Sequence, residues 1–120
     1  MTLTTQSPFA FPKAVRLLGA HQFRRVNKYG KTTGGKYLTI QVCVSKNSSL
    51  KLGLTVSRKY GDAVRRNRFK RLVREAFRLS QHSLPPRLHL NIRPTAAASG
   101  ATLSEIREEL IHLCTALERI

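Results

Sequence analysis

One stretch constrains this chain more than any other, the 22 residues from Ser57 to Arg78, which hold nine Lys or Arg residues and two acids. Apolar residues recur in it at spacings of three and four, which predicts a helix with one face on a core. That stripe consists of Phe69, Leu72, Val73, Ala76 and Phe77. Beside it, Arg66, Lys70 and Arg74 form a row at spacings of four. Such neighbours repel by roughly 0.2–0.5 kcal/mol per pair, and a bound polyanion would relieve the repulsion.

The charge of the whole chain points to the same class of partner. At pH 7 the formal net charge is +16, and residues 1–61 hold no acid. Four of the six acids lie between Glu105 and Glu118, so the positive field belongs to the body of the domain and not to its end. A solvated helix face usually mixes both signs of charge, whereas a field of one sign attracts polyanions and speeds their association. The sequence therefore favours binding to nucleic acid.

Length and composition predict a single domain over residues 1–120, and we expect its polar, proline-punctuated first 12 residues to be mobile. No run of about 18 apolar residues occurs, so we expect no membrane contact. No secretory signal is evident, and Cys43 and Cys114 lie in apolar surroundings typical of buried, reduced thiols. These features favour a cytoplasmic protein. The four histidines show no paired metal spacing, so we expect no metal site on the chain.

The first half of the chain predicts one helix and two strands. The helix is expected over 20–28, ending at Gly30, with Phe23 and Val26 on one face. Residues 32–35 are typical of a turn. Alternating apolar residues predict strands over 36–44 and 52–57, and the short connection between them predicts an antiparallel hairpin.

The second half predicts two helices that flank one strand. Asp62 is a suitable N-cap for the basic helix, which is expected to run to about Gln81. A strand is expected over 88–92, then a loop over 93–101. Thr102 and Glu105 fit a capping box for a final helix. The order α-β-β-α-β-α predicts an α/β (α+β) two-layer sandwich, a small mixed β-sheet with helices packed on it, in which right-handed crossovers are the default.

The basic stretch also resembles a known family. Its segments Arg66-Asn67-Arg68, Lys70-Arg71 and Arg74-Glu75-Ala76-Phe77-Arg78 are similar to the signature of the bacterial ribonuclease P protein family. The preceding Gly53-Leu54-Thr55-Val56-Ser57-Arg58-Lys59 resembles the strand that leads into that family's helix. The resemblance extends from roughly Arg16 to the final helix and is most specific between Leu52 and Arg78.

This resemblance implies a fold with a left-handed crossover through the basic helix, similar to a ribosomal protein. It implies a protein subunit of ribonuclease P that binds the catalytic RNA subunit and precursor tRNA and supports removal of the 5′ leader. Catalysis would belong to the RNA, with Mg²⁺ held mainly by the RNA and none bound tightly by the protein alone. The RNA-binding residues implied are Arg58, Lys59, Arg65, Arg66, Asn67, Arg68, Lys70, Arg71 and Arg74.

The resemblance further implies a cleft for the single-stranded leader of precursor tRNA between the first helix and the sheet. The positions that match it are Phe23, Leu38, Ile40 and Thr55. An aromatic ring in a basic groove can stack on unpaired bases, although Phe23 can equally be an ordinary core residue. Family members often carry another aromatic residue where this chain has Asn27, and Ile40 occupies a position that can also be aromatic.

Three other functions remain open at this point. A ribosomal or other structural RNA-binding protein would carry the same charge without a role in processing. A DNA-binding helix module is disfavoured, because strands flank the basic helix and no helix-turn-helix pattern is visible. A protein-only nuclease would need carboxylates that share metal ions. Asp62 and Glu75, the acids outside the last helix, lie about 20 Å apart along one helix, so we expect the chain alone to cleave no RNA.

Overall fold

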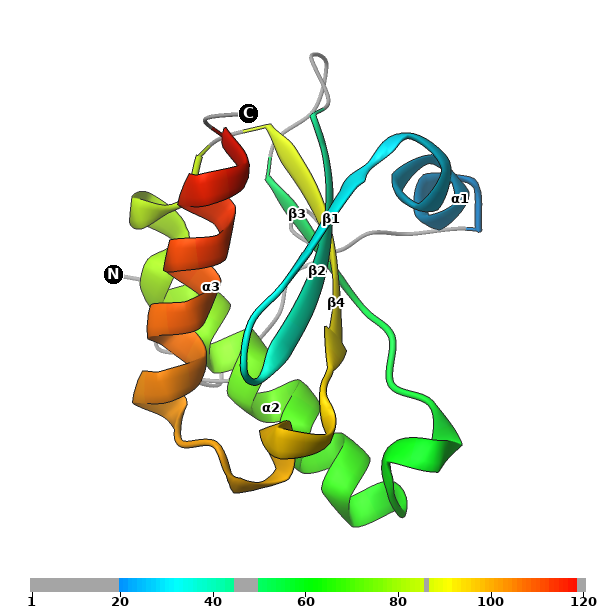
Figure 1. The fold of residues 1–120 in the computed structure, drawn as a ribbon, viewed down its shortest axis with the longest axis vertical. Helices are drawn as coiled ribbons and strands as arrows, with labels where there is room; N and C mark the ends of the chain where they lie inside the picture. The colour runs from blue at the N-terminus through cyan, green and yellow to red at the C-terminus, as the bar shows by residue number, and fades with distance from the viewer. Residues whose placement is uncertain (1–19, 45–49, 86, 119–120) are drawn as a thin grey trace, which may run out of the picture.

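The computed structural model describes residues 20–44, 50–85 and 87–118 (Figure 1). Its helices are α1 (Ala20–Tyr29), α2 (Ala63–Ser80) and α3 (Leu103–Glu118), and its strands are β1 (Lys31–Gly34), β2 (Leu38–Val44), β3 (Lys51–Leu54) and β4 (Leu88–Pro94). Within the same residues, short 3₁₀-helices form η3 (Arg58–Tyr60), η4 (Gln81–Ser83) and η5 (Ala96–Gly100). The segment 1–12, expected to be mobile, lies outside the described residues.

The strands form one sheet in the order β1-β2-β4-β3. β4 lies between β2, to which it is antiparallel, and β3, to which it is parallel. The predicted hairpin between 36–44 and 52–57 is therefore wrong. The first five residues of β4 are buried, as expected of a strand that is covered on both faces and paired on both edges. A local turn signal between two strands cannot reveal such a third strand between them.

The hairpin that does form joins β1 to β2, with Thr33 opposite Ile40. Residues 32–34, predicted as part of a turn, are strand, and the chain reverses at Gly35, whose N–H donates to the Leu38 carbonyl at 2.8 Å. The prediction failed because a Thr-Thr-Gly-Gly segment is typical of loops. An edge strand with mostly exposed side chains carries no hydrophobic alternation to identify it.

α2 and α3 cover one face of the sheet, and the main core lies between them and that face (Figure 1). As predicted, α2 buries Phe69, Val73, Ala76 and Phe77 there, whereas Leu72 is half-buried. The sheet contributes alternate residues, among which Leu38, Ile40 and Leu90 are fully buried. Burial of large apolar side chains at about 25 cal/mol per Å² stabilises this arrangement. It confirms the predicted α/β class, with β1 as an additional strand.

α1 packs on the opposite face of the sheet (Figure 1). Val26 of α1 is fully buried against Cys43 of β2, and Phe23 packs against this pair. Gly30 ends the helix as predicted, and its N–H donates to the Val26 carbonyl at 2.9 Å. A Cβ at Gly30 would lie 2.3 Å from that carbonyl oxygen and 2.9 Å from the Val42 carbonyl oxygen, so only glycine allows α1 to approach β2 this closely.

Capping side chains mark the starts of α2 and α3, as the sequence predicted. Asp62 Oδ1 accepts from the Arg65 N–H at 2.9 Å at the start of α2. The capping box of α3 is complete, because Glu105 N–H donates to Thr102 Oγ1 and Thr102 N–H donates to Glu105 Oε1. These contacts satisfy N–H groups that a helix start leaves without a partner. The predicted start of the basic helix is thus confirmed, and the helix ends at Ser80, one residue before the predicted end at about Gln81.

Glu109 of α3 ties the helix to the hairpin. Its carboxylate accepts three backbone N–H groups, from Lys36 at 2.8 Å, Tyr37 at 2.9 Å and Leu38 at 2.6 Å. Gly35 makes this possible, because a Cβ there would lie 2.5 Å from the Glu109 carboxyl carbon. One turn earlier, Glu105 Oε2 accepts from the Tyr37 hydroxyl at 2.6 Å. Two acids of the last helix therefore fix β2 against α3.

None of the helices in the described part of the chain is long and apolar enough to cross a membrane.

Candidate nucleic-acid interface

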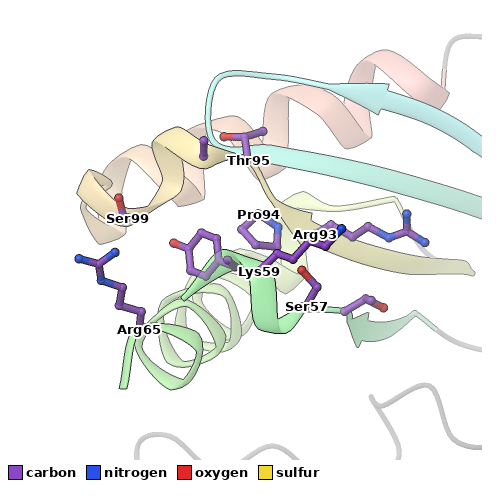
Figure 2. A pocket seen from close by; sticks show the side chains of 10 residues that line it. Ser57, Lys59, Arg65, Arg93, Pro94, Thr95 and Ser99 are labelled. Atoms are coloured by element: carbon purple, nitrogen blue, oxygen red, sulfur yellow. The ribbon is translucent and has the colours of Figure 1, made fainter. Parts of the chain in front are cut away.

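A hollow of about 530 Å³ lies where the sheet, η3, η5 and the start of α2 meet. We call it the basic hollow, and it is lined by Thr55, Ser57, Lys59, Tyr60, Arg65, Arg93, Pro94, Thr95, Ala96 and Ser99. Figure 2 shows Arg65 at one end, and Lys59 and Arg93 toward the other. Among the described residues, no acidic side chain lines the hollow, so its three exposed cations act together on whatever enters it.

The sequence positions the basic hollow through the turn between β3 and α2. η3 presents Lys59 outward, and Asp62 then caps α2 so that Arg65 is in the first helical turn. Arg93 comes from the exposed end of β4. Guanidinium groups bind phosphate oxygens in a bidentate manner and lysine adds a compact charge, so the three groups suit a phosphodiester chain.

Tyr60 forms part of the wall of the hollow. Its ring packs against Phe69 of α2 at a centroid distance of 5.8 Å, which holds η3 against α2. Burial raises the pKa of the Tyr60 phenol, although Arg68 and Arg65 lower it in part. Tyr60 is therefore neutral at physiological pH and presents an aromatic edge and a hydroxyl. Neither Tyr60 nor Arg93 was predicted, although Tyr60 follows two predicted cations directly.

The nine predicted RNA-binding residues do not share one environment. Six have exposed side chains, namely Arg58, Lys59, Arg65, Asn67, Arg68 and Arg71. The row of Arg66, Lys70 and Arg74 is half-buried along a flank of α2, and the Arg74 Nε atom is buried. Only Lys59 and Arg65 of the nine line the basic hollow. The row that the helical period singled out is thus less accessible than the residues on either side of it.

Arg68 is bound within the protein itself. Its Nη1 donates to the Ser99 carbonyl and its Nη2 to the Ala101 carbonyl, each at 3.1 Å. These two bonds attach η5 to α2 and fix the wall of the basic hollow that carries Ser99. The predicted role of Arg68 as a direct RNA ligand is untested, and the structure adds this positioning role.

We expect Arg68→Lys to loosen η5, because lysine keeps the charge but cannot span two carbonyls with one planar fork. The backbone N–H of Ala101, which donates to Ala98 within η5, should exchange with solvent about fivefold faster, equivalent to about 1 kcal/mol of lost hydrogen bonding. Arg71→Lys is the matched control, because no hydrogen bond of Arg71 is recorded among the described residues. Equal exchange in both variants would contradict the positioning role.

The four predicted leader-cleft residues lie on two different faces of the sheet. Leu38 and Ile40 are fully buried in the core beneath α2 and α3, so their predicted place in the cleft with Phe23 is wrong. The reason is the alternation of a strand, since Phe23 packs on the face that carries Cys43, and even-numbered residues of β2 point the other way. Asn27 is exposed on α1.

Thr55 instead joins a polar strip on the α1 face of the sheet, in which Thr55 is exposed, Gln41 is half-buried and Asn91 is buried. Its hydroxyl donates to Asn91 Oδ1 at 2.9 Å, and Asn91 Nδ2 donates to Gln41 Oε1 at 3.3 Å. Gln41 and Asn91 are register partners on β2 and β4, so the strip crosses the sheet from the segment after β3 to β2. We missed Gln41 and Asn91, although a polar residue within each apolar strand was visible in the sequence.

His89 lies on this same face, opposite Cys43, and is 4% exposed. Burial lowers the pKa of its imidazole, and the nearby cations Arg25 and Lys51 lower it further. Neither ring nitrogen has a hydrogen-bond partner among the described residues. His89 is therefore neutral at pH 7 and lies buried beside Cys43, the residue of β2 that packs against α1.

This pKa predicts how stability depends on pH. The folded chain binds the His89 proton less tightly than the unfolded chain, so the contribution of His89 is complete above the ordinary histidine pKa of 6.5 and is lost as pH falls below it. The free energy of unfolding should fall more between pH 7 and 5 in the natural chain than in His89→Leu. Exposed His112→Ala should behave like the natural chain. Parallel pH profiles for all three proteins would refute this assignment.

No group of three or more His, Cys, Asp or Glu side chains that could hold a metal ion occurs in the described part of the chain. Two acids near the basic residues already have partners. Asp62 caps α2, and the Glu75 carboxylate forms an ion pair with Arg78. The donors that Mg²⁺ prefers are therefore not gathered at the basic hollow.

Comparison with known proteins gives a consistent family. Residues 11–118 match the family model described as "Ribonuclease P". A "Ribonuclease P protein component" from Desulforapulum autotrophicum is 33% identical over 102 residues, which cover 85% of this chain and 87% of that protein. One from Lachnoclostridium phytofermentans is 39% identical over 97 residues, covering 81% and 84%.

Solved structures agree with this result. The ribonuclease P protein from Thermotoga maritima is similar with a TM-score of 0.76 and 31% identity, and the match covers 88% of this chain and 96% of that one. The Staphylococcus aureus ribonuclease P protein gives a TM-score of 0.76 at 28% identity, with 87% and 95% covered. The similarity therefore includes the sheet and helices that form the basic hollow.

Proposed function

The chain belongs to the bacterial ribonuclease P protein family and is thus the protein component of a holoenzyme with an RNA partner, and from this premise we propose how it acts. It binds the catalytic RNA and the 5′ leader of precursor tRNA. In this way it supports the Mg²⁺-dependent endonucleolytic cleavage that releases the leader and leaves the mature tRNA 5′ end. Its own side chains position the RNA and carry no bond-breaking step.

The observation that carries this proposal is the continuity between the basic hollow and the polar strip. Thr55 belongs to both, because it lines the hollow and donates to Asn91. A single strand whose phosphates contact the three cations of the hollow can therefore place unpaired nucleotides beside exposed Thr55 and half-buried Gln41. Phosphate contacts fix the register of a nucleic acid, and side-chain amides such as Gln41 can bond to bases.

The acids of the protein support the assignment of catalysis to RNA. Metal-assisted hydrolysis needs oxygen ligands gathered at one place, with ions about 3.5–4 Å apart in two-metal sites. The carboxylates near the hollow serve a helix cap and an ion pair, and those of Glu105 and Glu109 hold the hairpin. Mg²⁺ is accordingly proposed to be held mainly by the RNA, where phosphate oxygens suit it.

The test compares precursor tRNA with mature tRNA that lacks the leader. The natural chain should bind the precursor more tightly than the mature tRNA. Added catalytic RNA should then give leader release from the precursor that the protein alone does not give. Equal affinity for both tRNAs with no stimulation of cleavage would instead favour a structural RNA-binding protein without a processing role.

The variant Thr55→Val tests whether the leader contacts the polar strip. Valine keeps the shape and strand propensity of threonine but cannot donate to Asn91, so precursor binding should weaken by about two- to tenfold. Thr33→Val is the matched control, since Thr33 is opposite Ile40 and faces the core side of the sheet. If both variants bind precursor tRNA as the natural chain does, the leader does not use the polar strip.

A further inference from the structure

α2 bears a second hollow on a face that the basic hollow does not use. It has a volume of about 470 Å³, and none of the described residues lines both it and the basic hollow. α2 contributes Val64, Asn67, Arg68, Arg71, Leu72 and Glu75, and α3 contributes Leu103. The helical residues recur at spacings of three and one, so they form one continuous face of α2. We call this hollow the α2–α3 groove.

The floor of the groove is apolar, and although Leu103 also packs against the main core, Val64 does not. Val64 is 77% exposed, and Leu72 and Leu103 are half-buried. The main core takes other α2 residues, and Val64 is not among those packed against it. An apolar patch in the midst of cations typically marks a surface that a partner covers.

The rim of the groove is polar and mixed. Asn67 and Arg71 are exposed, so an amide that can donate and accept lies beside a cation. Glu75 adds carboxylate oxygens held in place by Arg78, and Arg68 is held by η5. The amide and the guanidinium groups can bond to an edge of a flat ligand that rests on the apolar floor, or to a phosphate beside it. The Glu75 carboxylate only accepts hydrogen bonds, so it can bond to an amino group of a base but not to a phosphate.

The charge of the protein and the apolar floor of the groove indicate which class of ligand fits. The net charge of +16 favours an anion, whereas the floor favours a flat apolar body. A nucleotide has both, and bases removed from a helical stack are commonly held between apolar side chains while their edges are hydrogen-bonded. Docking of a partner helix needs a longer row of apolar anchors at i, i+3, i+4 and i+7 than three separate side chains supply.

We propose that the α2–α3 groove receives one unpaired nucleobase of the RNA partner. The base lies on Val64, Leu72 and Leu103, Arg71 contacts an adjacent phosphate, and Asn67 bonds to the base edge. This inference rests on the proposed function, because it requires that the chain bind structured RNA. It adds to that function a contact that reads an extruded nucleotide and not the leader.

The experiment uses two RNA hairpins of equal length and charge, one with a bulged 2-aminopurine and the other with the same nucleotide paired. Val64→Ser removes part of the apolar floor at an exposed helical position, so folding is retained. Leu79→Ser is the matched control, because Leu79 is also an exposed apolar residue of α2, 40% exposed, but does not line the groove. Both changes leave the charge of the protein unaltered.

We expect Val64→Ser to weaken binding of the bulged hairpin by about fivefold, because serine buries less apolar surface beneath the base than valine does, and to leave the paired hairpin within about twofold. The 2-aminopurine fluorescence should change on binding the natural chain and Leu79→Ser, and much less with Val64→Ser. Equal affinities of the natural chain for both hairpins, or equal losses for both in Val64→Ser, would overturn the groove as a base site while leaving RNA binding intact. Failure of the natural chain to bind either hairpin would count against the proposed function and this inference together.

Discussion

Replacing Lys59, Arg65 and Arg93 together with alanine should lower the affinity for precursor tRNA by roughly 100- to 1,000-fold. Each cation is expected to make one charge-assisted contact with a phosphate, and such bonds contribute about 1.5–3 kcal/mol each before losses from exposure to solvent. The three side chains are exposed and lie outside the core, so thermal unfolding should remain close to that of the natural chain.

The salt dependence identifies the mechanism of this loss. The slope of log K against log [salt] should become less steep by about 2–3, since each lost phosphate contact accounts for roughly 0.7–0.9. Arg24, Lys28 and Lys31 provide a control triple that removes the same charge, is also exposed, and does not line the hollow. Identical effects of the two triples would show that net charge alone attracts the RNA, and the basic hollow would lose its special role.

The second large effect is expected in stability. Glu109→Ala should lower the free energy of unfolding by about 3 kcal/mol, because three backbone N–H groups lose a charged acceptor and two of them are partly buried. This is a large share of the roughly 5–15 kcal/mol that stabilises a typical domain. Thermal unfolding measured by circular dichroism should show a midpoint lower by about 10 °C.

Two further variants separate the contact from the charge. Glu109→Gln keeps one acceptor oxygen and the shape of the side chain, so its loss of stability should be intermediate. Exposed Glu108→Ala removes the same charge from the next position of α3 and should change stability by less than about 0.5 kcal/mol. A loss in Glu108→Ala as large as that in Glu109→Ala would mean that the charge of α3, and not the hairpin contact, is responsible.

The helices of this fold were predictable because their signals are local. Asp62, Thr102 and Glu105 mark helix starts by chemistry that acts within one turn, and all three make the expected bonds. Strand pairing is not local. β4 lies more than 30 residues later in the chain and pairs with both β2 and β3, so it separates them in the sheet. The turn-like sequence between β2 and β3 therefore predicted the wrong partners.

The residues of the candidate site were likewise predictable only where their signals are local in the sequence. Lys59 and Arg65 were predicted because they belong to one contiguous basic stretch, whereas Arg93 reaches the hollow only through the position of β4. Leu38 and Ile40 were assigned to the wrong face, since alternation along β2 shows which residues share a face but not which face α1 covers. Glu109 gave no signal at all, because its three partners lie more than 70 residues earlier in the chain.

The central place of β4 also affects the stage of synthesis at which the sheet and the basic hollow can form. β2 and β3 leave the exit tunnel before β4, and β3 has no other partner among the described strands. Until Leu88–Pro94 has emerged, the nascent chain presents strand edges that flank an empty central position, a form open to wrong pairing. Asn91 and Arg93 arrive with that same strand, so the basic helix is synthesised first as charge without a shaped surface. Closure of the sheet and the arrival of Asn91 and Arg93 therefore depend on one and the same segment, and η5, which follows it, then completes the wall of the basic hollow.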